Sequence, residues 1–244
     1  MSITDTYYEK ISHQLRQIKE TQMDAIDRAA DMFCRCVLNE RWIYVFGTGH
    51  SHMMAEELFY RAGGLTRIRP ILHPPLMLHL SAHDSTTAER DISIAPELLR
   101  KYPISSGDVL LVASNSGRNA VPVELALRAS DHGAQIIALV NRRHSAEYSS
   151  RHPSTKKLPD VADLIIDNCG VVGDACVPME DPAVMVGAAS TVTGAAILQM
   201  ITCATVEKLI AHGVRPEVFV SSNTEREEDN ERLVSKLKED VRHL

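Results

Sequence analysis

The chain has 244 residues, of which 44% are hydrophobic, enough for one large α/β domain with a sizeable core. Its formal net charge is −6 and it has no basic block, so nucleic acid is not expected as a partner. The first residues lack the hydrophobic region of a signal peptide, and no apolar run approaches the ~20 residues that span a bilayer. We therefore expect a cytoplasmic protein without a membrane partner.

The metal-ligating residue types show no spacing that is typical of a metal centre. The five cysteines are odd in number and have no second ligand pair at zinc spacing, so we expect reduced thiols. His79 and His83 are four residues apart, which on a helix would place both on one face. Their segment is rich in loop-forming residues, however, so the expectation is no metal and no cofactor.

The N-terminal third combines a long helical segment with a strand and a glycine-rich turn. Apolar residues recur at helical spacing from 4 to 39, with a possible break near Thr21. WIYVF at 42–46 predicts a buried strand, and the turn GTGHSH at 47–52 leads into a helix over 53–60. Residues 67–72 predict a short edge strand because they include Pro70. Residues 73–90 are expected to form a long loop with at most one helical turn, before a helix over 92–102.

A second unit of strand, polar turn and helix occupies the middle of the chain. VLLVA at 109–113 has the length of a buried parallel strand, and Ser114-Asn115-Ser116-Gly117-Arg118-Asn119 follows it. A helix with Pro122 in its first turn comes next. Such a turn presents backbone N–H groups and hydroxyls at the positive end of a helix dipole, where a phosphate binds well. An ordinary capped loop explains the same residues, and the pattern alone does not separate the two readings.

The remaining elements follow the same alternation as far as the last long helix. In chain order, the patterns predict a strand at 135–140, an exposed loop at 142–160, a strand at 163–167 and short strand character at 175–177. A small-residue helix is then predicted at 186–211, with Ser190 or Thr191 as its cap. The chain continues with an extended segment at 216–223 and a charged tail at 224–244, which is solvated or covers a partner.

These elements predict a single domain over 1–244, with an N-terminal helical segment (1–40), an α/β core (41–215) and a C-terminal tail (216–244). The alternation of strands and helices indicates a three-layer, doubly wound, mostly parallel sheet. Ligands of such sheets bind beyond the carboxyl ends of the strands, where the strand order reverses. Ser51 and Ser114 each follow a strand, so we expect them on the same rim.

The two turns together resemble the sugar isomerase (SIS) domain family. The resemblance rests on VFGTGHSHMMAEE at 45–57, ASNSGRN at 113–119 and the small-residue helix after Gly187. It extends over the whole chain and is strongest for a bacterial branch of single-domain proteins of unassigned substrate, which share FYRAGG from Phe59 and P-x-V-F-x-S-x-N from Pro216. Phosphoheptose isomerase is a better-known relative.

The resemblance implies a five-stranded parallel sheet (the SIS fold) and a sugar phosphate as ligand. By position, Ser114, Ser116 and Asn119 match the family's phosphate-binding loop, although Ser or Thr is usual where Asn119 stands; an amide can still donate to phosphate. Ser51 matches the ligand-binding residue of the first loop. The full expected binding set is Gly49, Ser51, Ser114, Asn115, Ser116, Gly117, Asn119 and Ser190.

An aldose–ketose isomerase needs a base that moves a proton between two carbon atoms through an enediolate. The resemblance implies a catalytic glutamate on the helix after Gly49, where Glu57 is the match, although a solvent-facing helix position explains Glu57 equally simply. Glu89 and Asp84 are further candidates. His50 is expected to protonate a ring oxygen or to pair with phosphate, unless it only structures its loop.

The sequence therefore predicts a phosphosugar isomerase. A non-catalytic phosphosugar-binding regulatory protein and a lyase or etherase acting on an amino-sugar phosphate stay open as alternatives. The apolar helices at both ends of the chain predict a homo-oligomer, a dimer or tetramer, with the site near the interface.

Overall fold

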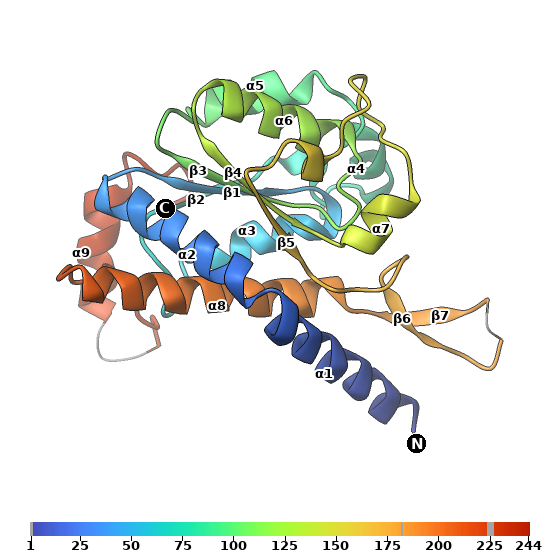
Figure 1. Cartoon of the computed structure of the whole chain (residues 1–244). Coiled ribbons are helices and arrows are strands. Elements are labelled where there is room, and N and C mark those ends of the chain that lie inside the picture. Colours follow the sequence, from blue (N-terminus) through green and yellow to red (C-terminus); the bar gives the residue numbers. More distant parts are fainter. Residues whose placement is uncertain (1, 182, 224–226) are drawn as a thin grey trace.

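The strands of the computed structural model, which describes residues 2–181, 183–223 and 227–244, form a parallel sheet in the order β2-β1-β3-β4-β5 (Figure 1). Because β1 lies between β2 and β3, the strand order reverses beside it, as the predicted doubly wound fold requires. The five predicted strands are confirmed, and β2 is an edge strand as Pro70 indicated. Their bounds are Ile43–Gly47 (β1), Ile68–Ile71 (β2), Val109–Ala113 (β3), Gln135–Val140 (β4) and Leu164–Asp167 (β5).

Helices cover both faces of this sheet (Figure 1). One face carries α2 (Met23–Leu38), α3 (Met53–Leu58) and α8 (Ser190–Ala211). The other face carries α5 (Ile94–Lys101) and α6 (Ala120–Asp131), whose first turn contains Pro122 as predicted. The N-terminal helical segment does break at the predicted point, since one residue, Gln22, separates α1 (Ile3–Thr21) from α2. The result is the expected three-layer arrangement.

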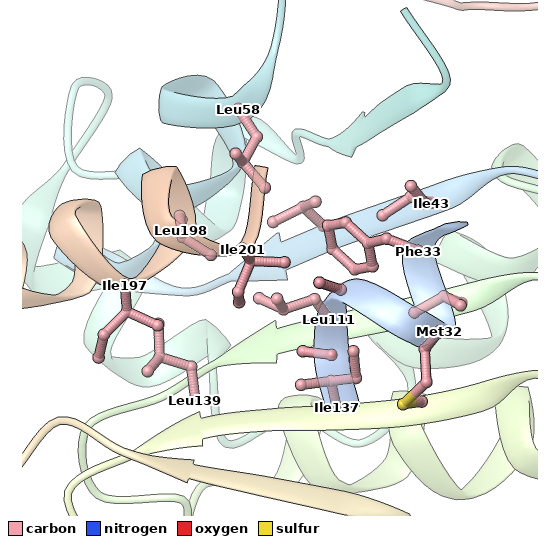
Figure 2. Packing of buried hydrophobic residues seen from close by; sticks show 14 of the residues in the cluster. Met32, Phe33, Ile43, Leu58, Leu111, Ile137, Leu139, Ile197, Leu198 and Ile201 are labelled. Carbon is pink, nitrogen blue, oxygen red and sulfur yellow. The ribbon is translucent and has the colours of Figure 1, made fainter. Parts of the chain in front are cut away.

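Two hydrophobic clusters hold the layers together, one on each face of the sheet. Figure 2 shows the first cluster, in which Phe33 of α2 and Ile197 and Ile201 of α8 pack against strand residues such as Leu111. The second cluster lies beneath α5 and α6. Every residue of β1 and β3 is buried, which explains why these strands are continuous apolar runs rather than alternating ones.

The helix predicted over 186–211 begins later than its composition indicated. Met185–Ala188 forms strand β7, paired antiparallel with β6 (Ala175–Pro178), and α8 starts at Ser190. The expectation that no apolar segment reaches membrane-spanning length was also wrong. Judged by length and composition alone, α8 is long and apolar enough to cross a membrane. It packs on α2 and α3, and its buried threonine hydroxyls donate to backbone carbonyls four residues back, as Thr205 does to Ile201 at 2.7 Å.

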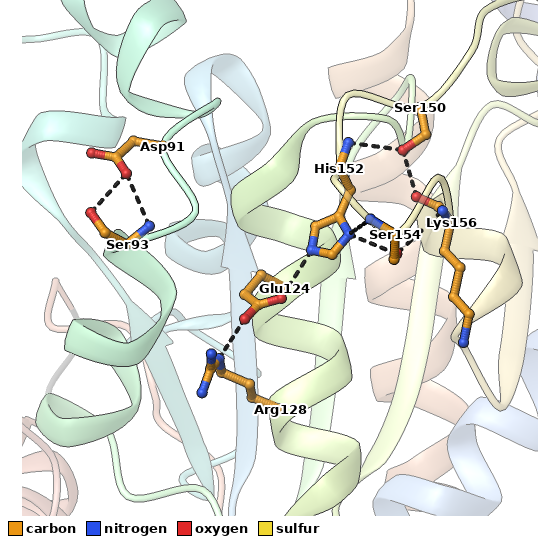
Figure 3. Close-up of polar contacts among 8 residues, drawn as sticks. All are labelled: Asp91, Ser93, Glu124, Arg128, Ser150, His152, Ser154 and Lys156. Carbon is orange, nitrogen blue, oxygen red and sulfur yellow. Dashed lines mark hydrogen bonds and ion pairs between the residues drawn. The ribbon is translucent and has the colours of Figure 1, made fainter.

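Two segments that were expected to be loops contain helices. Residues 73–90 include the turn η2 (Pro74–Leu76) and the two-turn helix α4 (Ala82–Ala88). Residues 142–160 include α7 (Arg142–Glu147) and the turn η3 (Leu158–Asp160). The second segment is not simply exposed, because His152 is buried and its Nε2 lies 2.9 Å from a carboxylate oxygen of Glu124 on α6 (Figure 3).

The C-terminal segment packs on the domain rather than extending into solvent. Val218 forms an antiparallel bridge with Leu65, within the stretch that was predicted to be extended. Helix α9 (Glu227–Leu237) follows, and Leu233, Leu237 and Val241 are buried. Charged residues on the other faces of this helix explain why the composition indicated a solvated tail. Residues 224–226 lie outside the described residues.

The buried pair of Glu124 and His152 generates a pH-dependent prediction. Backbone N–H of Ser154 donates to His152 Nδ1, so Nε2 carries the proton and donates to Glu124. Burial raises the pKa of Glu124, but the hydrogen bonds from His152 and Arg128 outweigh it, and the pKa lies below its ordinary value. The stability gained is therefore present above the unfolded pKa of about 4.3 and is lost as pH falls through the lower folded pKa.

We expect Glu124→Gln to lower the free energy of unfolding by about 1–3 kcal/mol at pH 7, measured by urea denaturation. The difference from the unmodified protein should shrink as the pH falls below about 4.3. Glu147→Gln, at an exposed position of α7, is the matched control and should change stability little. A difference for Glu124→Gln that stays constant down to pH 3 would contradict this account.

Candidate functional site

The turn after β1 is tightly folded because a glycine stands where no side chain fits. A Cβ at Gly47 would lie 2.2 Å from the carbonyl oxygen of Ser51, and Gly49 has a φ of +56°. The turn η1 (Gly49–His52) is closed by a hydrogen bond from Ser51 N–H to Thr48 O and by His52 Nδ1 on Gly49 O. Ser51 is thus fixed at the rim of the sheet.

The turn after β3 leaves backbone donors free at the start of α6. Gly117 N–H donates to the hydroxyl of Ser114 at 3.1 Å, and Gly117 adopts a φ of +61° that closes the turn. Within the described part of the chain, the backbone N–H groups of Ser116, Arg118 and Asn119 have no hydrogen-bond partner. Free N–H groups at the positive end of a helix dipole form an anion site.

A pocket opens between the two turns and the start of α8. It brings together five of the predicted binding or catalytic residues, namely His50, Ser51, Ser114, Asn115 and Ser190. Its wall is completed by Met54, Ala113, Leu139, Asn168, Thr191 and Gly194. Gly49, Ser116, Gly117 and Asn119 lie in the same two turns but outside this wall. Glu57 of α3 and Glu89, which follows α4, do not line the pocket either.

Asn168 is a pocket residue that the sequence analysis missed. It follows β5 directly, and its side-chain amide donates to Asn115 Oδ1 at 2.9 Å. This hydrogen bond links the segments that follow β3 and β5. Gln14 of α1 donates in turn to the carbonyl of Asn168 at 2.7 Å. A polar residue just after a buried strand was the signal that could have identified Asn168, as it did Ser51 and Ser114.

The start of α8 is capped by a residue that is distant in sequence. Asp174 accepts hydrogen bonds from the backbone N–H groups of Ala189 and Ser190 and from the Ser190 hydroxyl at 2.7 Å. The prediction that Ser190 or Thr191 caps this helix was therefore wrong, because a carboxylate supplies the cap from the loop before β6. Since the Ser190 hydroxyl donates to Asp174, its oxygen can only accept from a ligand in the pocket.

The side chain of Asn119 is oriented by an arginine. Arg151 Nη1 donates to Asn119 Oδ1 at 2.9 Å, and a guanidinium can only donate. The oxygen of the amide therefore faces Arg151, and its NH₂ group carries no hydrogen bond among the described residues. Asn119 thus offers donors at the start of α6, where the family resemblance led us to expect a serine or threonine hydroxyl.

Comparison with known proteins decides the family. A model of the SIS domain matches residues 6–141, more than half of the chain. The chain belongs to the SIS domain family. It is 41% identical over 244 residues to a UPF0309 protein of Caldanaerobacter subterraneus, with 98% of this chain and 99% of the relative covered.

Solved structures share the SIS fold at low identity. Phosphoheptose isomerase from Neisseria gonorrhoeae has a TM-score of 0.54 and 16% identity, and the match covers 82% of this chain and 96% of that one. The Vibrio vulnificus NanR protein complexed with ManNAc-6P has a TM-score of 0.53 and 12% identity, and covers 99% and 71%. The predicted SIS fold is confirmed.

The two candidate carboxylates Glu57 and Glu89 contact different elements around the pocket. Glu57 is three residues beyond the pocket residue Met54, and its carboxylate accepts from Gln199 of α8 at 2.9 Å and pairs with Arg61. Glu89 ends α4, accepts from the hydroxyl of Thr48 at 2.8 Å, and receives Val121 N–H on its carbonyl. Glu89 therefore contacts the turn after β1 and the start of α6, whereas Glu57 contacts α8.

The remaining candidates lie in exposed places. Asp84 is exposed in the first turn of α4, and hydrogen bonding from Ser81 lowers its pKa, which favours the charged form at neutral pH. His79 precedes α4 and does not share a helix with His83. In the ranges that the structure describes, no group of three His, Cys, Asp or Glu side chains is arranged to hold a metal ion.

The orientation of Asn119 predicts how substitutions change anion binding. Asn119→Asp replaces the free donors with acceptors and adds a negative charge, so the affinity for a sugar phosphate should fall about ten-fold or more, measured by titration calorimetry. Asn119→Ser restores a donor and should keep the affinity within about three-fold. Equal affinity in Asn119→Asp and the unmodified protein would show that this amide does not face the anion.

Proposed function

We propose that this SIS protein is a phosphosugar isomerase that interconverts an aldose and a ketose phosphate through an enediolate. The observation that carries the proposal is the set of free N–H donors at Ser116, Arg118 and Asn119, next to a pocket lined by hydroxyl and amide groups. The donors suit a phosphate, and the hydroxyls and amides suit the hydroxyl groups of a sugar. A cytoplasmic location agrees with a free sugar phosphate as substrate.

The proposed chemistry needs a base beside the sugar carbons and a group that moves protons between oxygens. Glu89 is favoured as the base because its side chain contacts the β1 turn through Thr48 and its carbonyl contacts the start of α6 through Val121. His50 is exposed at the pocket wall and can exchange protons with a ring oxygen. Glu57 acts in this scheme only if it leaves Arg61 and Gln199.

A non-catalytic phosphosugar sensor is the second candidate. The pocket wall contains no Asp or Glu side chain among the described residues, and a binding protein needs none. NanR, which shares the fold, is complexed with ManNAc-6P, so the fold can carry a phosphosugar in another protein. A lyase or etherase acting on an amino-sugar phosphate would use the same proton abstraction and would release an acid instead of an isomer.

The test is conversion of a panel of hexose, heptose and amino-sugar phosphates, followed by NMR with the purified protein. We expect turnover of at least one of them and a loss of about 100-fold or more in kcat for Glu89→Gln, because the base is removed. Glu57→Gln should reduce kcat less.

Two results separate the candidate functions, and a third decides which glutamate is the base. Binding of a sugar phosphate without turnover would establish the sensor, and release of an acid would establish the lyase. Glu147→Gln, on the exposed face of α7, is the control for loss of a carboxylate and should keep full activity. A larger loss for Glu57→Gln than for Glu89→Gln would transfer the role of the base to Glu57.

We further propose a homo-oligomer built around α1 and the β6–β7 hairpin, which project together from the domain (Figure 1). Tyr7 of α1 donates to Ala188 O at 2.8 Å and contacts the hairpin where Gly187 leaves room. The exposed large apolar side chains of this projection are Ile3, Tyr8, Met179, Val184, Met185 and Val186. Such a surface is typical of a protein interface.

Sedimentation velocity should show a dimer or tetramer for the unmodified protein at micromolar concentration. Replacing Met185 in the hairpin by Asp should shift the population toward the monomer, because a charge is buried unpaired in the interface. Val214→Asp, at an exposed apolar position after α8, is the control. A stable monomer of the unmodified protein would contradict the proposal.

A further inference from the structure

Three arginines gather where the turn after β3 (residues 114–119, the phosphate loop of the proposed function) meets α6. Arg118 is part of the loop itself, Arg151 contacts the loop through Asn119, and Arg90 follows Glu89 at the end of α4. Among the described residues, none of the three has a carboxylate within ion-pair distance. This is unexpected in a chain of net charge −6, where acidic partners are in excess.

The electrostatics show that these charges lie close to one another. Burial lowers the pKa of Arg151, and the positive charges of Arg118 and Arg90 lower it further, whereas the nearby Glu89 raises it. Three like charges beside a single carboxylate repel one another, and a bound anion reduces that cost. The arrangement therefore favours a ligand that brings negative charge.

Arg118 has an unused donor inside the protein. Its Nε is buried and has no hydrogen-bond partner among the described residues. The guanidinium lies over the ring of Tyr148, with Cζ 5.4 Å from the ring centroid, which restrains its plane. The terminal Nη1 and Nη2 of Arg118 also have no hydrogen-bond partner among the described residues and, unlike Nε, are not sealed from solvent, so they are the donors that a ligand oxygen can reach.

Arg151 is held in place by the loop that carries it. His152 fixes this loop to α6 through Glu124, and the Ser150 hydroxyl donates to Lys156 O at 2.6 Å, as Figure 3 shows. Arg151 N–H donates to Arg118 O at 2.8 Å, which ties the loop to the phosphate loop. With the loop held in this way, Arg151 Nη1 reaches Asn119 Oδ1 at 2.9 Å.

We propose that Arg118 and Arg151, with Arg90 beside them, form a second anion subsite next to the phosphate loop. The inference rests on the proposed function and narrows its substrate class to sugar phosphates with a second anionic group, a carboxylate or a second phosphate. The planar fork of donors on a guanidinium matches the paired oxygens of both groups. The backbone donors at Ser116, Arg118 and Asn119 are left for the first phosphate.

Matched pairs of ligands test the subsite by titration calorimetry at fixed ionic strength. One pair is glucose 6-phosphate and 6-phosphogluconate, and the other is fructose 6-phosphate and fructose 1,6-bisphosphate. The ligand with two anionic groups should bind at least about ten-fold more tightly than its partner in at least one pair. The pair that shows the preference distinguishes a carboxylate from a second phosphate.

Variants separate this subsite from the phosphate loop. Arg118→Gln should reduce the preference to within about three-fold while the affinity for the singly phosphorylated sugar changes little, because the substitution keeps the backbone N–H of residue 118. Arg151→Gln should also reduce the preference, but it releases Asn119 and therefore lowers the affinity for both ligands as well. Arg28→Gln removes the same charge at an exposed position of α2 and should keep the full preference. An equal loss of affinity for both members of a pair would show that the arginines hold the first phosphate, and would overturn the proposal.

Failure of the second subsite is distinguishable from failure of the proposed function. If single phosphates bind and no pair shows a preference, the second subsite is absent and the phosphate loop stands. If no sugar phosphate binds at all, both proposals fall.

Discussion

Unpaired backbone N–H groups at the start of α6 are the constraint around which the site is built. A backbone donor that lacks a partner is costly unless water or a ligand satisfies it. Here Gly117 adopts a left-handed conformation, and its N–H donates to the Ser114 hydroxyl. This turn geometry leaves the backbone N–H groups of Ser116, Arg118 and Asn119 without protein partners among the described residues. The buried strands on both sides hold this geometry because their apolar residues are packed on both faces.

Residues from distant parts of the chain keep this loop in place. Behind it, Leu158 N–H donates to Gly117 O at 2.8 Å, and Asn141 N–H donates to Asn115 O at 3.0 Å. On the other side, Asp174 fixes the start of α8. The pocket is therefore formed by fixed turns on a packed sheet, which is the arrangement that suits orientation of a small polar ligand.

The sequence was sufficient for those parts of the fold that depend on local patterns. Apolar runs such as 109–113 and the turns that follow them predicted the strands, and the rule that parallel strands end on one edge brought Ser51 and Ser114 together. Contacts between residues that are distant in sequence could not be predicted from these local patterns. Nothing local indicated that Asp174 caps α8, or that His152 is buried against Glu124 from a stretch of polar residues.

The site was predictable to the same extent. The two turns were found from their residues, whereas the direction of Glu57 depends on how α3 packs against α8 and was not visible in the spacing. Residues 186–188 are small and apolar, which suits strand and helix alike, so the start of α8 was placed too early. Asn119 was noted as a departure from the family, but its orientation depends on Arg151, 32 residues away.

Backbone amide chemical shifts during titration with a sugar phosphate test the central claim most directly, because they report on the donors themselves. The account predicts that the amide signals of Ser116, Arg118 and Asn119 shift downfield in a saturable way and more than those of any other segment. Saturable binding with these three signals unmoved would contradict it.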